Sequence, residues 1–553
     1  MAQAVYGVFA AHGGADSFCG VSARDEPGSD GTVHGAGAEE CYMFGHLRSL
    51  LSASFVSRGA CRPHHRVCYL AYNPTPDPTV LRLYSDIKKG CGSRLECKTM
   101  KTRLIRCAHL LLCTVLVGAA TGGGAIILHY LLDIMQELTF GHTEAEHPIV
   151  TDHSDTVRRV LVLIAVGVAV SIIWFLLQRR TKLASVKAQI RGETPQERRP
   201  GFLRQTLHSL TQIVAVGAGA PVGKEVAPRE LGALFAGRLA DLMRIPQTVR
   251  PVLVASAAAA GLAAVYQVPV GGFVFLFEAL GLALSLRNIF TGVILIFVAT
   301  CTAHLVIPDA PTYPVPQLQT TGESLLLAVV LGLTITPLAL WFRAASQRAE
   351  SRKTTNRNVL WRLPLVLALV AVTSIFLPEI LGNGRPLTQH IFDAASGLSS
   401  SSSRLDATAL SQALLYALAL LAAKAILVVA SLRNGAYGGT LTPGLALGSA
   451  CGFVLTGALI LVFPTLIQLQ PGAGALHASE LLGIAGLLGA VTFLSLSMNA
   501  PLSACALILG FAGQDWQAYA PVAVAVGTAW GVKYLWMRLG NKTQPSRRPY
   551  GQR

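Results

Sequence analysis

The sequence predicts an all-α polytopic membrane protein, and both its composition and its long apolar runs support that prediction. Of the 553 residues, 52% are hydrophobic and only 13% are charged, a balance that excludes an ordinary soluble domain and a disordered chain. Apolar runs of spanning length recur between residues 104 and 537, and about 20 apolar residues suffice for a helix to cross a bilayer. The sequence lacks the short alternating strands of an outer-membrane barrel.

Residues 1–99 differ in composition from everything that follows them. They are polar, rich in Gly, Ser, Cys and His, and carry six of the 11 cysteines at spacings that match no zinc site. The run from Met100 to Arg106, three basic residues leading into an apolar helix, resembles a natural start. We therefore expect residues 1–99 to be a poorly ordered N-terminal extension that is not native, followed by a transmembrane domain over residues 100–540.

Each later apolar run predicts one membrane span. The first contains glycines that allow close helix packing, and a Pro/Gly break interrupts the Ala- and Gly-rich run after residue 252. The predicted spans of the first half are residues 104–138, 157–177, 252–284 and 289–307. Those of the second half are residues 325–342, 363–376, 413–429, 444–463, 481–496 and 522–539, with a shorter apolar segment at 505–510.

The charged residues between the spans predict the orientation of the chain. The net charge is +16, and basic residues cluster at 179–204, at 343–362 and in the C-terminal tail. The loop at 137–155 is acidic, and the loop at 308–323 carries little positive charge. By the positive-inside rule the basic loops, the N-terminus and the basic tail at 541–553 are cytoplasmic, and no nucleic-acid partner is expected.

Two Gly/Pro-rich breaks interrupt this apolar sequence, at residues 217–230 and 434–443. In lipid, such a break is tolerated only where it lines a cavity or is packed in protein, and a carboxylate at that depth, here Glu225, is a functional candidate. An apolar helix follows each break, and helix N-termini attract anions. Paired broken helices in the two halves of a membrane protein indicate a transport site near the bilayer midplane.

The basic and acidic neighbours of Glu225 are expected to have structural roles. A free lysine in the pathway would hold an anion too tightly for it to leave, so Lys224 is expected to pair outside the pathway. Arg229 and Glu230 are expected to pair with each other at the break.

A repeated passage predicts an internal duplication. Gln267-Val-Pro-Val-Gly-Gly272 in the first half resembles Asn499-Ala-Pro-Leu-Ser-Ala504 in the second, and each follows a small-residue helix and precedes an apolar one. The two halves would cover about residues 100–310 and 320–540. Transporter repeats of this kind are usually inverted in the membrane.

These motifs together resemble the CLC family of chloride channels and chloride/proton antiporters, in its prokaryotic form without CBS domains. They occur in the order of the family and cover residues 100–540. The matching passages are Gly223-Lys-Glu225, Tyr266-Gln-Val-Pro-Val-Gly-Gly-Phe-Val-Phe-Leu-Phe-Glu278, Pro378-Glu-Ile-Leu-Gly-Asn-Gly384, Gly438-Gly-Thr-Leu-Thr-Pro443 and Asn499-Ala-Pro-Leu502.

The resemblance implies a CLC-type inverted repeat of tilted and partial helices. It implies a homodimer in the bacterial inner membrane, with one chloride pathway in each subunit, no cofactor and no enzymatic activity. Glu225 would be the gate, its carboxylate mimicking and displacing a chloride ion, and Glu278 would be a second gating or proton-handling carboxylate. The implied anion-binding residues are Ser185, Gly223, Val226, Ala227, Gly439, Thr440 and Leu441, with Tyr534 as the nearest candidate for the family's C-terminal site tyrosine.

Several positions depart from the family pattern and leave alternatives open. Val226 and Ala227 replace Gly-Pro, and Leu441 stands where phenylalanine is usual. Ala279 occupies the position of the antiporters' internal glutamate, which favours a voltage- or pH-gated channel or an uncoupled transporter over an antiporter. A fluoride/proton exchanger of the same fold is an alternative, because such relatives also lack that glutamate. An intramembrane hydrolase is a further alternative, but the sequence contains neither Gly-x-Ser-x-Gly nor His-Glu-x-x-His.

Overall fold

The computed structural model describes residues 94–147, 149–152, 154–179, 182–308, 310–313, 315–400, 406–463 and 474–542. Nearly all of the expected extension at 1–99 and of the tail at 541–553 lies outside these residues. The described chain is helical, and its single strand-like feature is an isolated antiparallel bridge between Gly223 and Gly439. The predicted all-α class is therefore confirmed.

Seven helices of the described chain are long and apolar enough to cross a membrane. Most of the residues of α5 and α12 are at least partly exposed, as lipid-facing helices require, because lipid solvates apolar side chains. The seven are α4 (Arg94–Phe140), α5 (Thr156–Gln178), α12 (Leu286–His304), α13 (Gly322–Ser351), α16 (Ala407–Arg433), α17 (Leu441–Val462) and α18 (Gly474–Met498).

The other helices are shorter than 18 residues, except α20, which is long but less apolar. Among them, α8 and α15 were not predicted as separate elements, because polar residues interrupt their apolar pattern. These remaining elements are α6 (Val186–Arg191), α7 (Pro195–Arg198), α8 (Phe202–Gly217), α9 (Val226–Leu242), α10 (Arg250–Tyr266), α11 (Pro269–Glu278), α14 (Val359–Thr373), η1 (Pro378–Ile380), α15 (Arg385–Ser400), α19 (Pro501–Phe511), η3 (Trp516–Ala518) and α20 (Tyr519–Lys542).

The two related motifs have the same local backbone conformation. Gln267 lies between α10 and α11 with φ at 52°, and Asn499 lies between α18 and α19 with φ at 59°. In each half a proline two residues later opens the next helix, because proline has no amide to lose there and its fixed φ suits a first helical turn. The same sequence motif therefore makes the same left-handed kink in both halves.

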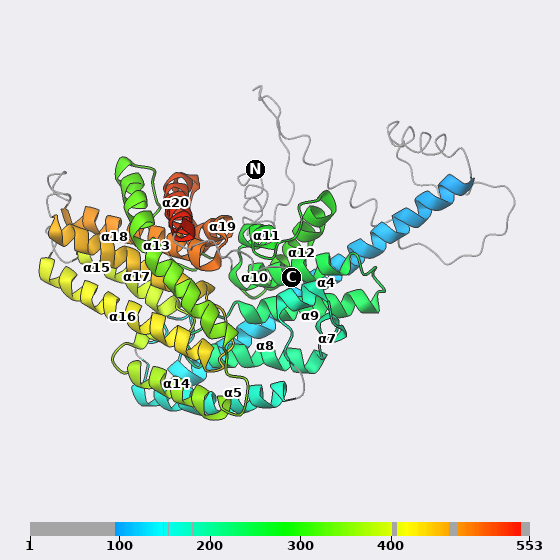
Figure 1. The fold of residues 1–553 in the computed structure, drawn as a ribbon, viewed down its shortest axis with the longest axis horizontal. Coiled ribbons are helices and arrows are strands. Elements are labelled where there is room, and N and C mark those ends of the chain that lie inside the picture. The colour runs from blue at the N-terminus through cyan, green and yellow to red at the C-terminus, as the bar shows by residue number, and fades with distance from the viewer. Residues whose placement is uncertain are drawn as a thin grey trace, which may run out of the picture. The chain divides into compact units, whose positions relative to one another are not determined.

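Small residues bring helices of this fold into close contact. A Cβ atom on Gly452 of α17 would collide with the carbonyl of Ala485 in α18, and one on Gly261 of α10 would collide with the carbonyl of Pro228 in α9. Figure 1 shows α17 and α18 side by side, and α5 packed along α14. Such backbone-to-backbone packing replaces the hydrophobic effect, which does not drive helix association within lipid.

Candidate anion pathway

The two predicted breaks meet in the structure. The amide of Gly223 donates to the carbonyl of Gly439 at 2.8 Å, and the amide of Gly439 donates back to Gly223 at 2.9 Å. Helix α9 begins just after the first break and α17 just after the second. The two bonds therefore hold two helix N-termini together, and each N-terminus carries roughly half a positive charge.

Glu225 places its side chain on the helix that belongs to the other break. Its carboxylate is fully buried, and Oε1 accepts the amide of Leu441 at 2.8 Å while Oε2 accepts the hydroxyl of Thr442 at 3.2 Å. The first amides of a helix have no partner inside it. Glu225 thus acts as the N-cap of α17, although by position it precedes α9, whose amides its side chain does not cap.

The glycines of the bridge make room for this carboxylate. A Cβ atom on either Gly223 or Gly439 would collide with the carboxyl group of Glu225. Their expected role as amide donors to an anion needs correction, because both amides are already used in the bridge. The amide that meets a negative charge is that of Leu441, and the hydroxyl of its neighbour Thr442, which was not among the predicted ligands, meets the same carboxylate.

The remaining predicted residues of the two breaks lie at the helix starts. Val226 and Ala227 form the first turn of α9, where amides have no partner inside the helix. Thr440 immediately precedes α17, and its own side chain makes no capping bond. The carboxylate of Glu225 therefore supplies the cap that Thr440 does not.

Two other predicted ligands lie elsewhere. Ser185 is exposed and caps α6, where its Oγ accepts the amide of Ala188 at 3.3 Å. The Tyr534 side chain is 51% exposed on α20, with the guanidinium of Arg538 at 4.7 Å from its ring centroid. Neither residue contacts Glu225 within the described chain, and the anion ligands proposed below therefore do not include Tyr534.

Glu278 caps a helix of the opposite half. Its carboxylate accepts the amides of Leu502 at 3.0 Å and Ser503 at 2.6 Å, and also the Ser503 hydroxyl at 2.6 Å. These groups open α19, which is the counterpart of the helix that Glu278 ends. The contacts are those of a helix cap, and they lie at the far end of α11 from the Gln267 kink, about 13 Å along a ten-residue helix.

Arg229 and Glu230 do not form the expected pair with each other. Arg229 donates its Nε–H to the backbone carbonyl of Glu225 at 2.8 Å. Glu230 turns to α8, where its Oε2 lies 2.8 Å from Nε2 of Gln212 and 3.3 Å from Nε2 of the buried His208. Arg229 therefore helps to fix the backbone of the break, and Glu230 belongs to a separate buried polar network.

A cavity of about 300 Å³ lies beside the Glu225 carboxylate on the side that the charge pattern assigns to the exterior. Thr442, which donates to Glu225, is one of its lining residues. The loops at 144–145 and 307–313, predicted to face outward, contribute to its wall. The cavity therefore leads from the outer loops to the hydrogen-bond partner of Glu225.

An ion-pair cluster of Glu144, Lys224 and Arg385 forms one wall of this cavity. Oε2 of Glu144 lies 3.2 Å from Nζ of Lys224 and 3.0 Å from a guanidinium nitrogen of Arg385. Burial alone would raise the pKa of Glu144, but the charges of Lys224 and Arg385 and the hydrogen bonds from Arg385 and Gln136 outweigh it and hold this pKa at about 2. Lys224 is thus paired with Glu144, but contrary to expectation this pair lies in the wall of the candidate route and not outside it.

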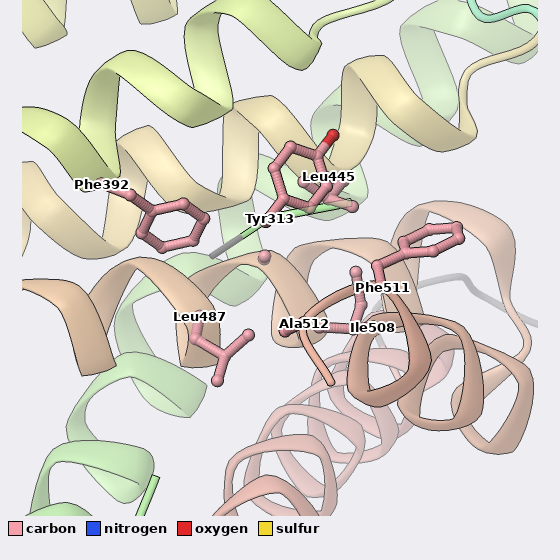
Figure 2. Close-up of a pocket in the computed structure, with 8 residues that line it drawn as sticks. Tyr313, Phe392, Leu445, Leu487, Ile508, Phe511 and Ala512 are labelled. Carbon is pink, nitrogen blue, oxygen red and sulfur yellow. The ribbon is translucent and has the colours of Figure 1, made fainter. Parts of the chain in front are cut away.

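A second, smaller pocket does not resemble a pathway. It encloses only about 10 Å³, at the lower limit for one water molecule. Its lining is apolar apart from Tyr313, whose hydroxyl points away from Leu487 in Figure 2. The outer cavity is therefore the better candidate for an anion route within the described residues.

Sequence and structure comparisons relate this chain to known proteins. The family model described as "Voltage gated chloride channel" matches residues 166–534. The voltage-gated ClC-type chloride channel ClcB of Escherichia coli strain SMS-3-5 is 29% identical over 320 residues, which is 57% of this chain and 69% of that protein. ClcB of strain K12 / DH10B is 27% identical over the same shares.

Three solved structures share the fold. A slow cyanobacterial Cl⁻/H⁺ antiporter matches with a TM-score of 0.58 and 17% identity, covering 79% of this chain and 99% of that one. A CLC-type fluoride/proton antiporter has a TM-score of 0.55 and 17% identity, covering 76% and 94%. A eukaryotic CLC transporter has a TM-score of 0.59 and 18% identity, covering 80% and 73%.

Proposed function

This chain belongs to the voltage-gated chloride channel family, and from that premise we propose that Glu225 is the gate of its chloride pathway. The observation that supports this most directly is the pair of donors on the carboxylate, the Leu441 amide and the Thr442 hydroxyl. Chloride and a carboxylate carry the same charge, so both cannot occupy this position together. When Glu225 swings away, these donors receive the anion.

The strength of such a site suits transport. Helix N-termini contribute about 0.3–2 kcal/mol each to binding a negative charge, and a hydrogen bond to a charged group contributes about 1.5–3 kcal/mol. Desolvation of the anion offsets much of this gain. The resulting weak binding lets the ion leave again, which conduction requires.

Protonation of Glu225 predicts the direction in which anion flux changes with pH. A protonated carboxyl group is neutral, so it competes less with an anion, and lower pH should raise anion flux. In proteoliposomes, Glu225→Gln should remove most of this pH dependence and leave flux measurable. Glu197→Gln is a matched control, because Glu197 is an exposed cap of α7. Parental pH dependence in Glu225→Gln would overturn the proposed gate.

The coupling mode is a second part of the proposal. Ala279, at the position of the antiporters' internal glutamate, supports a channel or an uncoupled transporter, and the fold shared with a Cl⁻/H⁺ antiporter keeps the coupled alternative open. Chloride efflux should be measured together with proton uptake by the same vesicles. Proton movement against its gradient, driven by chloride, would identify an antiporter. A faster fluoride than chloride efflux would instead favour the fluoride/proton exchanger.

We further propose that the protein is a homodimer of the bacterial inner membrane, not an enzyme and without a cofactor, with both termini in the cytoplasm. The basic loops at 179–204 and 343–362 support this orientation. Cysteines placed one at a time in the 308–313 loop should react with an impermeant thiol reagent from the outside. Labelling that occurs only after the membranes are lysed would indicate the opposite orientation.

A further inference from the structure

The outer cavity contains two hydrogen-bond donors that the protein itself does not satisfy. Tyr266 is only 8% exposed, and its buried hydroxyl makes no hydrogen bond of standard geometry in the described chain, although the Thr442 side chain lies near enough to interact with it. Nε of Arg385 is likewise buried and unpartnered, although another nitrogen of this guanidinium binds Glu144. Buried polar groups are nearly always paired, and leaving one unpaired costs about 1–3 kcal/mol. Both residues line the same cavity.

The charges around this cavity favour an anion. Lys224 and Arg385 share the single carboxylate of Glu144, so the cluster retains one net positive charge. The Lys224 ammonium lies 5.7 Å from the ring centroid of Tyr266, which places this charge next to the phenol. The other carboxylate in the wall, Asp133, is already 3.4 Å from Nε2 of His129. The charged and titratable groups that face the cavity are Lys224, Arg385, Glu144, Asp133, His129, Tyr266 and Tyr313.

We propose that this cavity is an anion-docking site outside the gate, where the Tyr266 hydroxyl and Nε of Arg385 hold a small monovalent anion. The proposal rests on the proposed function of Glu225. Thr442 joins the two sites, because it lines the cavity and also donates to Glu225. The docked anion waits beside the donors of α17 and moves onto them when the carboxylate leaves.

The test is Tyr266→Phe in the full chain, because this change removes one oxygen atom and keeps the ring. Chloride influx into proteoliposomes is measured against external chloride concentration. The half-saturating concentration should rise about ten- to a hundredfold, as expected for the loss of one hydrogen bond to an anion, with a nearly unchanged maximal rate. Tyr519→Phe removes the same atom from an exposed tyrosine at the start of α20 and should change neither value.

A second variant covers the case in which Tyr266→Phe does not fold, as judged by size-exclusion elution and thermal melting. Arg385→Lys keeps the charge beside Glu144 and removes the Nε–H donor, so it too should raise the half-saturating concentration. An unchanged half-saturating concentration in a folded variant overturns the docking site. A fall in the maximal rate alone also overturns it, because the residue would then act after docking. The pH dependence of flux reports on Glu225 separately, so failure of the gate and failure of the docking site are distinguishable.

Discussion

Two glycines, Gly223 and Gly439, decide where the Glu225 carboxylate can lie. Each leaves open the space that a methyl group would fill, and the carboxylate uses both spaces to reach the start of α17. The burial of this charge is offset by donors from a helix far away in the sequence. Changes at these glycines should therefore act on the gate without touching any atom of Glu225.

Gly439→Ala should displace the gate. The added methyl group would collide with the carboxylate, which must then leave Leu441 and Thr442. We expect higher flux at neutral pH, a weaker pH dependence, and a loss of stability of about 1–3 kcal/mol from overpacking. Flux measured from pH 5 to pH 8 checks this. Gly527→Ala is the control, because nothing lies within 4 Å of its Cβ position. A Gly439→Ala variant with the parental pH profile would contradict the expectation.

Glu144 should contribute a pH-dependent part of the stability. Its pKa is about 2 in the fold against an ordinary 4.5, so the folded state holds its proton less tightly than the unfolded state. The corresponding stabilisation, about 3 kcal/mol at most, is present above pH 4.5 and is lost as the pH falls toward 2. Thermal melting in detergent should show this loss for the parent. Glu144→Gln should melt lower at pH 6 and lose less on acidification; an equal loss in both proteins would argue against the assignment.

At the level of helices, the unpaired ends of partial helices are satisfied by side chains from distant elements of the chain. Glu225 caps α17, and Glu278 caps α19. Lys424, fully buried in α16, donates to the carbonyls of Ile380 and Gly382 at 2.6 and 2.7 Å. Helices that start or stop within a bilayer require such partners, because lipid offers none.

Glu278→Ala should therefore loosen the start of α19. It removes the acceptor of three hydrogen bonds, and we expect a loss of about 2–3 kcal/mol, above the usual value for a cap because three donors lose their acceptor. Glu278→Gln keeps one acceptor oxygen and should lose less. Melting in detergent ranks the two variants against the parent. Equal melting of Glu278→Ala and the parent would remove the capping role and favour a proton-handling one.

The sequence was informative about helices and breaks, and less so about contacts between distant segments. Apolar runs located the seven helices of spanning length, whereas the predicted spans at 252–284, 363–376 and 522–539 form α10 and α11, α14 and α20, which are not among those seven. The two related motifs predicted a duplication, and both have a positive φ in the structure, at Gln267 and Asn499. Thr442, Glu144 and the partners of Glu278 could not be predicted, because each contact joins residues at least 80 positions apart. The amides of Gly223 and Gly439 were misassigned for the same reason, since only the folded chain shows that they bond to each other.

For the whole molecule, the family match covers residues 166–534 and leaves residues 1–99 outside it. Composition sets this extension apart from the helical domain that begins near residue 100. The transport function we propose uses residues only from the later part. The extension should therefore be dispensable for chloride flux.

A chain that starts at Met100 should transport chloride at close to the parental rate. Proteoliposomes with equal amounts of each protein provide the comparison, and mass spectrometry of the native N-terminus provides an independent check. A peptide from residues 1–90 in the cellular protein would sink the hypothesis that the extension is not translated. A large loss of flux on truncation would give the extension a role in transport or assembly.

The bridge between Gly223 and Gly439 has a consequence for how the route opens. Two backbone hydrogen bonds fasten the halves of the chain beside the gate, so rotating one side chain is less costly than parting the halves. Flux should then depend only weakly on bilayer thickness and on lipid stiffness. A protein whose halves had to separate would be far more sensitive to both.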